Sequence, residues 1–486
     1  MTLPPRFTRS ARWVPVALAV LFSVLLVRRA MVISSRIKEA PLTFFSPYSS
    51  DVDESCWLSS TYFYDLFFVK HDFVNEDWFR VISYDQPPVG KYILGASLHL
   101  FRNKLVEDNA GLEYWFRTML GKHHLQALSR LYERTQLPSD HEMLTYVSSI
   151  VYSMKTTEEP RTLDEPDYYE GRRTVMVFAF LSMVLLAGVT SFNVRHLFPA
   201  LLASLLVLSS NLTEYVFRRI YVDAFCCFFV LITLLVLFEL MAELRRLAQR
   251  RGRIVFLSAM EGVALATALS TKFINMYLGA VVAAVYLVSL LSRAIGARRG
   301  GFSVPPIRLL VASGVIVAVS AAIFFVAINP LFYREPLTHL SQMLHHRLIT
   351  MQAQARVQSP VISSHFFPRW ALIVDKGVFI RLADHVPAKV LMSVPFLVGL
   401  GRLVREAAKD LAMGRSAGAS MITCCWTFVT FAVNGTMIHV DWGRYFIPFN
   451  MCSAVVIAVG VQVIYDFLMA KLPAQMGNFG RHEPDL

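Results

Sequence analysis

Long apolar runs alternate with polar segments along most of this chain. A helix needs roughly 20 apolar residues to cross a hydrocarbon core of ~30 Å, and about ten runs approach that length. They begin near Trp13, Thr174, Leu197, Ile220, Ile254, Phe273, Leu309, Ala388, Ala417 and Phe446. The pattern predicts an all-α polytopic membrane protein with about ten transmembrane helices.

The placement of basic residues predicts the orientation of these helices. Three short loops within residues 245–253, 293–308 and 402–415 are rich in Arg and Lys, and all three fall on the same side of the predicted topology. Short loops rich in Lys and Arg stay in the cytoplasm, so both termini are expected there too. Two long polar segments, 34–173 and 329–387, then lie on the outer face.

These features divide the chain into five parts. Residues 1–33 are expected to form a cytoplasmic segment and an uncleaved signal anchor, because a basic stretch precedes an apolar run that no small-residue cleavage site follows. Residues 34–173 form the first outer loop, with an inserted helical region within 102–170. Helices 2–7 occupy 174–328, the second outer loop 329–387, and helices 8–10 with a short cytoplasmic tail 388–486.

Composition excludes most other classes of protein. Of 486 residues, 55% are hydrophobic and only 17% are charged, whereas soluble domains carry about 25% charged residues. The mean hydropathy is +0.48. The net charge of +12 does not indicate nucleic-acid binding, because the basic residues cluster in the loops between apolar runs. The lipid bilayer is therefore the expected partner, and the six cysteines give no disulfide framework.

Candidate chemistry begins directly after the first apolar run. Asp51, Asp53 and Glu54 place three carboxylates within four residues, which suits a general base or a metal ligand, although a solvated charge run explains them equally well. Further on, Pro87-Pro88-Val-Gly-Lys91 precedes an apolar stretch. A proline pair there is an ordinary helix start.

Taken together, the motifs are more informative. In chain order they are the pair Asp53-Glu54, Pro87-Pro88-Val-Gly-Lys91, Arg172 before the second helix, Arg218-Arg219-Ile-Tyr-Val-Asp223, Ser270-Thr-Lys272, and Asp441-Trp-Gly-Arg444-Tyr445-Phe-Ile-Pro448. This order resembles the protein O-mannosyltransferase-like and aminoarabinose-transferase-like glycosyltransferases of the GT-C superfamily. The resemblance runs from about residue 10 to about residue 465.

The resemblance implies a GT-C fold and an inverting transfer of a monosaccharide from a polyprenyl-phosphate-linked donor to an extracytoplasmic acceptor. It implies Asp53 as the general base, Glu54 orienting the acceptor or a divalent metal ion, and Asp51 as the alternative carboxylate. Cationic side chains suit the leaving phosphate, and those expected there are Arg218, Arg219, Lys272 and Arg444. The residues expected to contact the acceptor or shape the site are Gln86, Pro87, Pro88, Lys91, Arg172, Asp223, Asp441 and Tyr445.

The chain departs from that family in three places. Gln86 stands where relatives often have His or Lys, residues 102–170 align with nothing in the family, and no sugar-binding domain follows the last helix. These departures disfavour eukaryotic-type protein mannosylation and favour a bacterial inner membrane. A glycan, a lipid, a polymer and a protein all stay open as the acceptor, and metal dependence stays open too.

Each motif also has an ordinary explanation. Arg and Lys at helix ends often extend to lipid headgroups, and Asp223 could form a structural ion pair with Arg219. Glu261 lies deep within an apolar run, and the adjacent His345 and His346 point in different directions on a helix, which disfavours a shared metal. The alternative functions are a transporter or flippase of lipid-linked sugars, and a non-catalytic membrane scaffold.

Overall fold

The fold was analysed in a computed structural model of the chain. The structure describes residues 5–38, 52–79, 87–111, 163–246, 250–298, 307–345, 362, 365–379, 386–438 and 443–479. Within these ranges every regular element is helical, as the apolar pattern predicts.

Seven helices are long and apolar enough to cross a membrane. They are α1 (Pro5–Ser35), α9 (Glu165–Ser191), α12 (Asp223–Arg245), α13 (Arg251–Leu269), α14 (Met276–Arg298), α15 (Ile307–Ile328) and α21 (Ile447–Phe479). An eighth span is broken: α10 (Leu197–Ser209) and α11 (Asn211–Phe217) meet at an angle of 72°. The chain is an integral, multi-pass membrane protein.

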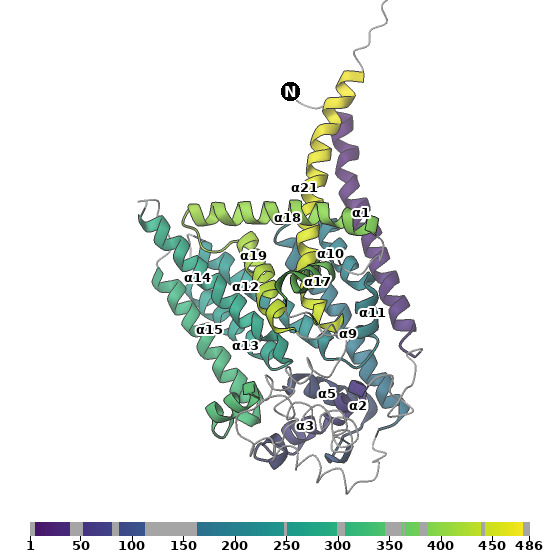
Figure 1. The fold of residues 1–486 in the computed structure, drawn as a ribbon, viewed down its shortest axis with the longest axis vertical. Helices are drawn as coiled ribbons and strands as arrows, with labels where there is room; N and C mark the ends of the chain where they lie inside the picture. Colours follow the sequence, from purple (N-terminus) through teal and green to yellow (C-terminus); the bar gives the residue numbers. More distant parts are fainter. Residues whose placement is uncertain are drawn as a thin grey trace, which may run out of the picture.

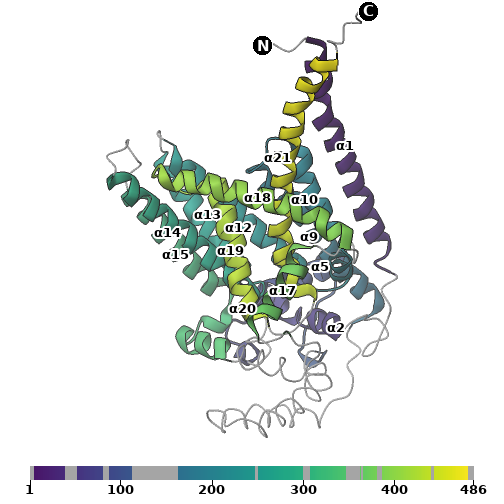
Figure 2. The same cartoon turned by 45° about the horizontal axis from the view of Figure 1, so that its top comes forward.

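The predicted count of about ten helices is not confirmed, since α18 and α19 fail the same test. The helix α18 (Val386–Ala412) crosses one end of the bundle instead of running along it (Figures 1 and 2). The helix α19 (Ala419–Val429) is short and continues through a π-helical turn (Thr430–Asn434) into α20 (Gly435–Met437). In α18 the charged side chains of its second half interrupt the apolar run, which the sequence analysis counted as a span.

One face of α18 packs closely on α21. A Cβ atom on Gly399 would lie only 2.0 Å from the carbonyl oxygen of Val456, so only glycine permits this approach. Other faces of α18 carry exposed apolar side chains such as Leu391 and Leu397. A helix with one packed face, exposed apolar residues and several charges is typical of an interfacial helix.

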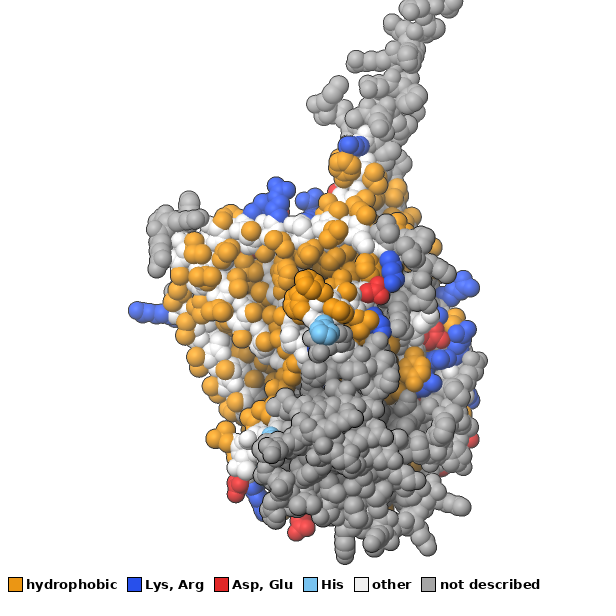
Figure 3. Space-filling model, in the orientation of Figure 1, with side chains coloured by type: hydrophobic (Ala, Val, Ile, Leu, Met, Phe, Trp, Pro, Cys, Tyr) orange, Lys and Arg blue, Asp and Glu red, His pale blue; other side chains and the backbone are white. Residues whose placement is uncertain are grey.

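The three basic segments meet at this end of the bundle. Arg245 forms a two-pronged ion pair with Asp410 (2.9 and 2.8 Å), and Arg293 donates hydrogen bonds to Ser416 and to the Leu244 carbonyl. The prediction that these segments share one side of the membrane agrees with this contact. Figure 3 shows Lys and Arg side chains along this edge and a mainly apolar wall beneath it.

The opposite end carries short helices from the first long polar segment (Figure 1). They are α2 (Val52–Ser59), α3 (Tyr62–Tyr64), η1 (Asp65–Val69), η2 (Glu76–Phe79) and α5 (Val89–Arg102). Aromatic contacts pack these helices together; the rings of Phe63 and Trp78, for example, lie 4.8 Å apart.

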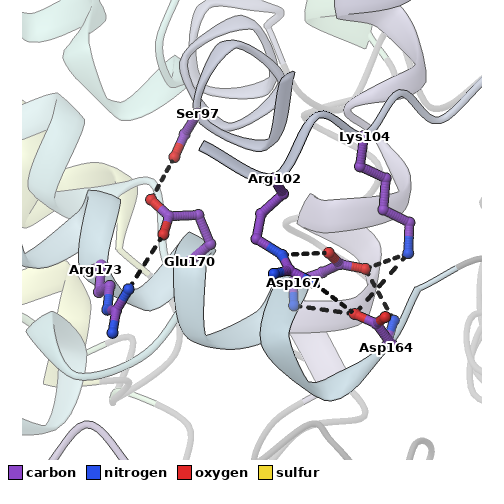
Figure 4. A network of polar contacts seen from close by, with 7 residues as sticks. All are labelled: Ser97, Arg102, Lys104, Asp164, Asp167, Glu170 and Arg173. Atoms are coloured by element: carbon purple, nitrogen blue, oxygen red, sulfur yellow. Dashed lines mark hydrogen bonds and ion pairs between the residues drawn. The ribbon is translucent and has the colours of Figure 1, made fainter. Parts of the chain in front are cut away.

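Ion pairs fasten this part to the start of α9 (Figure 4). Arg102 and Lys104, at the end of α5, both contact the buried carboxylate of Asp167, and Ser97 donates to Glu170 at 3.0 Å. Asp164 caps the first turn of α9 through a reciprocal capping box with Asp167. The short helices are therefore held against the bundle by charge as well as by apolar packing.

Candidate active site

The acidic helix α2 is anchored by a buried ion pair. Glu54 accepts two hydrogen bonds from Arg172 of α9 (2.9 and 2.8 Å), and both residues are 0% exposed. One oxygen of Glu54 also accepts from the backbone N–H of Ile220 (3.0 Å). The pair thus fixes the start of α2 between α9 and the loop that precedes α12. Asp53 lies in the first turn of α2, where only its backbone is described, and Asp51 lies outside the described residues.

This geometry gives Glu54 and Arg172 a structural role. Both carboxylate oxygens of Glu54 accept hydrogen bonds from protein donors. The expected contact of Glu54 with an acceptor or a metal stays a prediction. Within the described ranges, no group of three or more His, Cys, Asp or Glu side chains lies close enough together to hold a metal ion. His345 is exposed at the end of a described segment, and His346 falls outside it.

A second ion pair joins two of the predicted motifs. The Lys272 ammonium lies 2.9 Å from Asp223 Oδ1, and both side chains are largely buried. The other oxygen of Asp223 is buried and has no hydrogen-bond partner among the described residues. Asp223 thus pairs with Lys272, whereas Arg219 stacks on the ring of Tyr215 at 3.7 Å. Asp223 therefore orients Lys272, 49 residues away in the chain.

The motif near the last helix meets the same region. The 3₁₀ turn η7 (Gly443–Phe446) carries Arg444, whose guanidinium lies 5.1 Å from the ring centre of Tyr221. The Lys272 ammonium lies 5.8 Å from the ring centre of Tyr445. Asp441 lies outside the described residues. Arg444 and Tyr445 thus approach the segments that carry Arg219 and Lys272.

The Pro-Pro helix α5 begins against these segments. The backbone N–H of Val89 donates to the Ser270 carbonyl at 3.0 Å. A Cβ atom on Gly90 would lie 2.6 Å from Val222 Cγ1, so the glycine of the motif lets α5 approach the residue before Asp223. The Tyr92 hydroxyl donates to the Ile328 carbonyl (3.1 Å), and burial raises the pKa of this tyrosine.

A cavity of about 330 Å³ opens beside the start of α5. Pro87, Pro88 and the buried Lys91 line one side, and the rest is lined by Trp78 and by mainly apolar residues of α13, α14, α15 and the segment 329–343. The Lys91 ammonium lies 4.4 Å from the ring centre of Phe63. Gln86 lies outside the described residues. The cavity combines one cationic side chain with a mainly apolar wall.

The structure therefore brings five separate motifs to one end of the bundle. The segments 53–54, 87–91, 219–223, 270–272 and 444–445 are linked by the contacts given above. We call this region the outer cluster. Glu261 is separate from it: this residue is fully buried in α13, and neither carboxylate oxygen has a hydrogen-bond partner among the described residues.

Arg218 is oriented differently from the other predicted phosphate ligands. Its guanidinium lies 3.7 Å from Glu214 in α11, which also contacts Arg29 of α1 and Arg36 just beyond α1. The sequence analysis missed Tyr215 and Tyr221, on which Arg219 and Arg444 stack. It also missed Arg369, which lies in the second outer loop without a recognisable motif around it.

Comparison with known proteins agrees with this geometry. The family model of the dolichyl-phosphate-mannose-protein mannosyltransferases matches residues 148–335, a range that contains Arg172, Arg219, Asp223 and Lys272. This match covers less than half of the chain and agrees with the resemblance that its motifs carry. The acidic pair and Arg444 lie outside the matched range. No curated protein matches the chain significantly in sequence.

The chain is weakly similar to two solved structures. One is the oligosaccharyltransferase of Archaeoglobus fulgidus tethered to an acceptor peptide with the NVT sequon. The match has 12% sequence identity and a TM-score of 0.46, and it covers 92% of this chain and 50% of the other. The other is AglB of the same organism in complex with an inhibitory peptide and a dolichol-phosphate. This match has 12% sequence identity and a TM-score of 0.42, and it covers 96% of this chain and 52% of the other. The chain thus spans about half the length of these two proteins.

Proposed function

We propose that the outer cluster transfers a monosaccharide, with inversion, from a polyprenyl-phosphate-linked donor to an acceptor on the extracytoplasmic face. The observation that carries this proposal is the convergence of the acidic helix α2 with Lys272, Arg219 and Arg444. A displacement at a sugar carbon needs a base on the incoming hydroxyl and positive charge on the departing phosphate. The carboxylates of α2 and the cations beside them suit these two roles.

Asp53 is the proposed base. One of its carboxylate oxygens takes the proton of the acceptor hydroxyl while the oxygen of that hydroxyl attacks the anomeric carbon. The bond between this carbon and the phosphate oxygen breaks, and its electron pair leaves with the phosphate. Attack from the face opposite the leaving group inverts the configuration. The Glu54–Arg172 pair positions Asp53 by fixing the next residue of α2.

The cations of the outer cluster receive the phosphate. Lys272 is held by Asp223, and Arg219 and Arg444 are stacked on tyrosine rings, so these three side chains lose little further freedom when they bind an anion. Guanidinium groups suit phosphate because they donate two parallel hydrogen bonds. We place the first apolar units of the polyprenyl chain in the cavity beside Pro87 and Pro88, with Lys91 at its polar side.

The test uses purified protein in nanodiscs with a panel of radiolabelled polyprenyl-phosphate sugars, with and without a divalent metal. We expect Asp53→Asn to lower donor turnover at least about 100-fold while donor binding survives, as the loss of a general base would. The matched control is Asp108→Asn, an exposed carboxylate in the loop after α5 whose hydrogen bond to the Ala110 N–H an amide can keep.

Four outcomes would contradict parts of this proposal. Unchanged turnover in Asp53→Asn would move the base to Asp51. If turnover requires a divalent metal, and Asp53→Asn abolishes both turnover and metal binding, Asp53 is a ligand of that metal. Donor movement across a vesicle membrane without sugar transfer would establish a transporter or flippase, and an absence of both would favour a scaffold. A bacterial inner membrane is the proposed location.

A further inference from the structure

Three arginines converge on one carboxylate beside the outer cluster. Glu214 of α11 forms an ion pair with Arg29 of α1, which also donates to the Leu208 carbonyl where α10 ends. Arg36, just beyond α1, lies 3.1 Å from the same carboxylate, and Arg218 lies 3.7 Å from it. Three positive charges and one negative charge leave two positive charges uncompensated within this group.

These cations are accessible from outside the protein. The side chains of Arg29, Arg36 and Arg218 are 24%, 46% and 19% exposed, whereas Glu214 is 11% exposed. Figure 3 shows Lys and Arg side chains gathered on the edge of the molecule next to the lower end of α1. An anion outside the protein can therefore reach the exposed parts of these arginine side chains.

The position of the group indicates what kind of anion it meets. The apolar span of α1 runs from Trp13 to Ser35, and only 11% of its most apolar window is buried in the protein. Arg29 and Arg36 thus lie on a lipid-facing helix, within and just beyond the last turns of its span. Side chains at that depth reach the level of phospholipid phosphates. Uncompensated arginines on the outer side also oppose the usual distribution of basic residues, which a bound anion would explain.

We propose that Arg29, Arg36 and Arg218 bind the phosphate group of an anionic phospholipid at the outer end of α1. Glu214 holds the guanidinium groups together when the site is empty and competes with the phosphate for them. The bound lipid braces α1 against the bend between α10 and α11, because Arg29 contacts both the Leu208 carbonyl of α10 and Glu214 of α11. This site is distinct from the Lys272–Asp223 pair and does not depend on the proposed transferase activity.

Lipid binding tests this proposal directly. The protein in a mild zwitterionic detergent is titrated with phosphatidylglycerol, phosphatidylcholine or inorganic phosphate, while its unfolding temperature is recorded and lipid retention is counted by native mass spectrometry. We expect phosphatidylglycerol to stabilise the wild type at concentrations where phosphatidylcholine and inorganic phosphate do not. Stabilisation by inorganic phosphate alone would assign the site to a soluble anion instead.

Two variants should change the affinity in opposite directions. Arg36→Gln removes a half-exposed charge and should weaken phosphatidylglycerol binding about tenfold. Glu214→Gln removes the competing carboxylate and should tighten it. The matched control is Arg173→Gln, another exposed arginine at this end, which pairs with Glu170 at 3.6 Å. Equal affinity in wild type, Arg36→Gln and Arg173→Gln would overturn the proposal even if Glu214→Gln fails to fold.

Discussion

Replacing Arg369 should test how the outer cluster is held in place. Arg369 lies in α17 (Phe366–Val378) and is only 9% exposed. It donates to the carbonyls of Gly435 (2.8 Å), Thr436 (2.7 Å) and Ile438 (2.7 Å). These carbonyls end α20, shortly before the turn that carries Arg444. A positively charged donor suits the carbonyl end of a helix.

The same helix also holds the chain beyond that turn. The side-chain amide of Asn450 in α21 donates to the carbonyls of Lys376 (2.9 Å) and Gly377 (3.0 Å) in α17. Contacts of α17 therefore lie on both sides of the segment that carries Arg444. Loss of the Arg369 contacts should let this segment move and displace Arg444 from the proposed phosphate site.

The magnitude follows from the three hydrogen bonds. Bonds to a charged donor contribute about 1.5–3 kcal/mol each, and Arg369→Lys can keep roughly one of them. We expect the free energy of unfolding to fall by about 3 kcal/mol or more. If Arg444 contacts the leaving phosphate, kcat should fall more than tenfold as well. The matched control is Arg293→Lys at the opposite end, where a buried arginine also donates to a backbone carbonyl, that of Leu244 (3.2 Å).

Thermal unfolding and donor turnover are measured for both variants. Both should lose stability, and only Arg369→Lys should lose turnover at temperatures where both remain folded. A double-mutant cycle adds a second readout: Arg369→Lys should have little further effect on kcat in an Arg444→Gln background. Full additivity of the two changes, or normal turnover in Arg369→Lys, would refute a positioning role.

Two further substitutions test the contacts that assemble the site. Glu54→Gln leaves the buried guanidinium of Arg172 without its counter-charge and should lower the free energy of unfolding by about 3–5 kcal/mol. The double variant Glu54→Gln, Arg172→Met should recover much of this loss. Equal stability of wild type and Glu54→Gln in thermal melts would contradict this expectation. Gly90→Ala places a Cβ atom 2.6 Å from Val222 Cγ1, so we expect a loss of about 1–3 kcal/mol. The added change Val222→Ala should restore stability and donor turnover, and no rescue would mean that the contact is not the cause.

Much of the architecture could be predicted from the sequence because the bilayer imposes a simple rule. Backbone groups in hydrocarbon must be bonded internally, so a long apolar run is a helix whatever surrounds it. For this reason the runs near Trp13, Thr174 and Leu309 correspond to helices in the structure. The segment of α18 was counted as a span although the charged residues of its second half shorten the apolar run, and the helix instead packs across the end of the bundle.

Site residues were predictable as candidates but not as partners. The motifs identified Glu54, Arg172, Asp223 and Lys272 through their order along the chain, which resembles that of the GT-C glycosyltransferases. The ion pair between Glu54 and Arg172 could not be predicted from the sequence, because these residues are 118 positions apart and meet only when α2 packs on α9. Asp53 stays a prediction, as its side chain is not described.

The sequence by itself determined that this chain is a helical membrane protein with basic loops at one end, because hydropathy and charge act locally and without reference to the rest of the fold. Only the tertiary structure decided that Asp223 holds Lys272 and that Arg218 turns towards α1. Charge pairing in a low-dielectric interior depends on distances of a few ångströms, and packing between distant segments sets those distances.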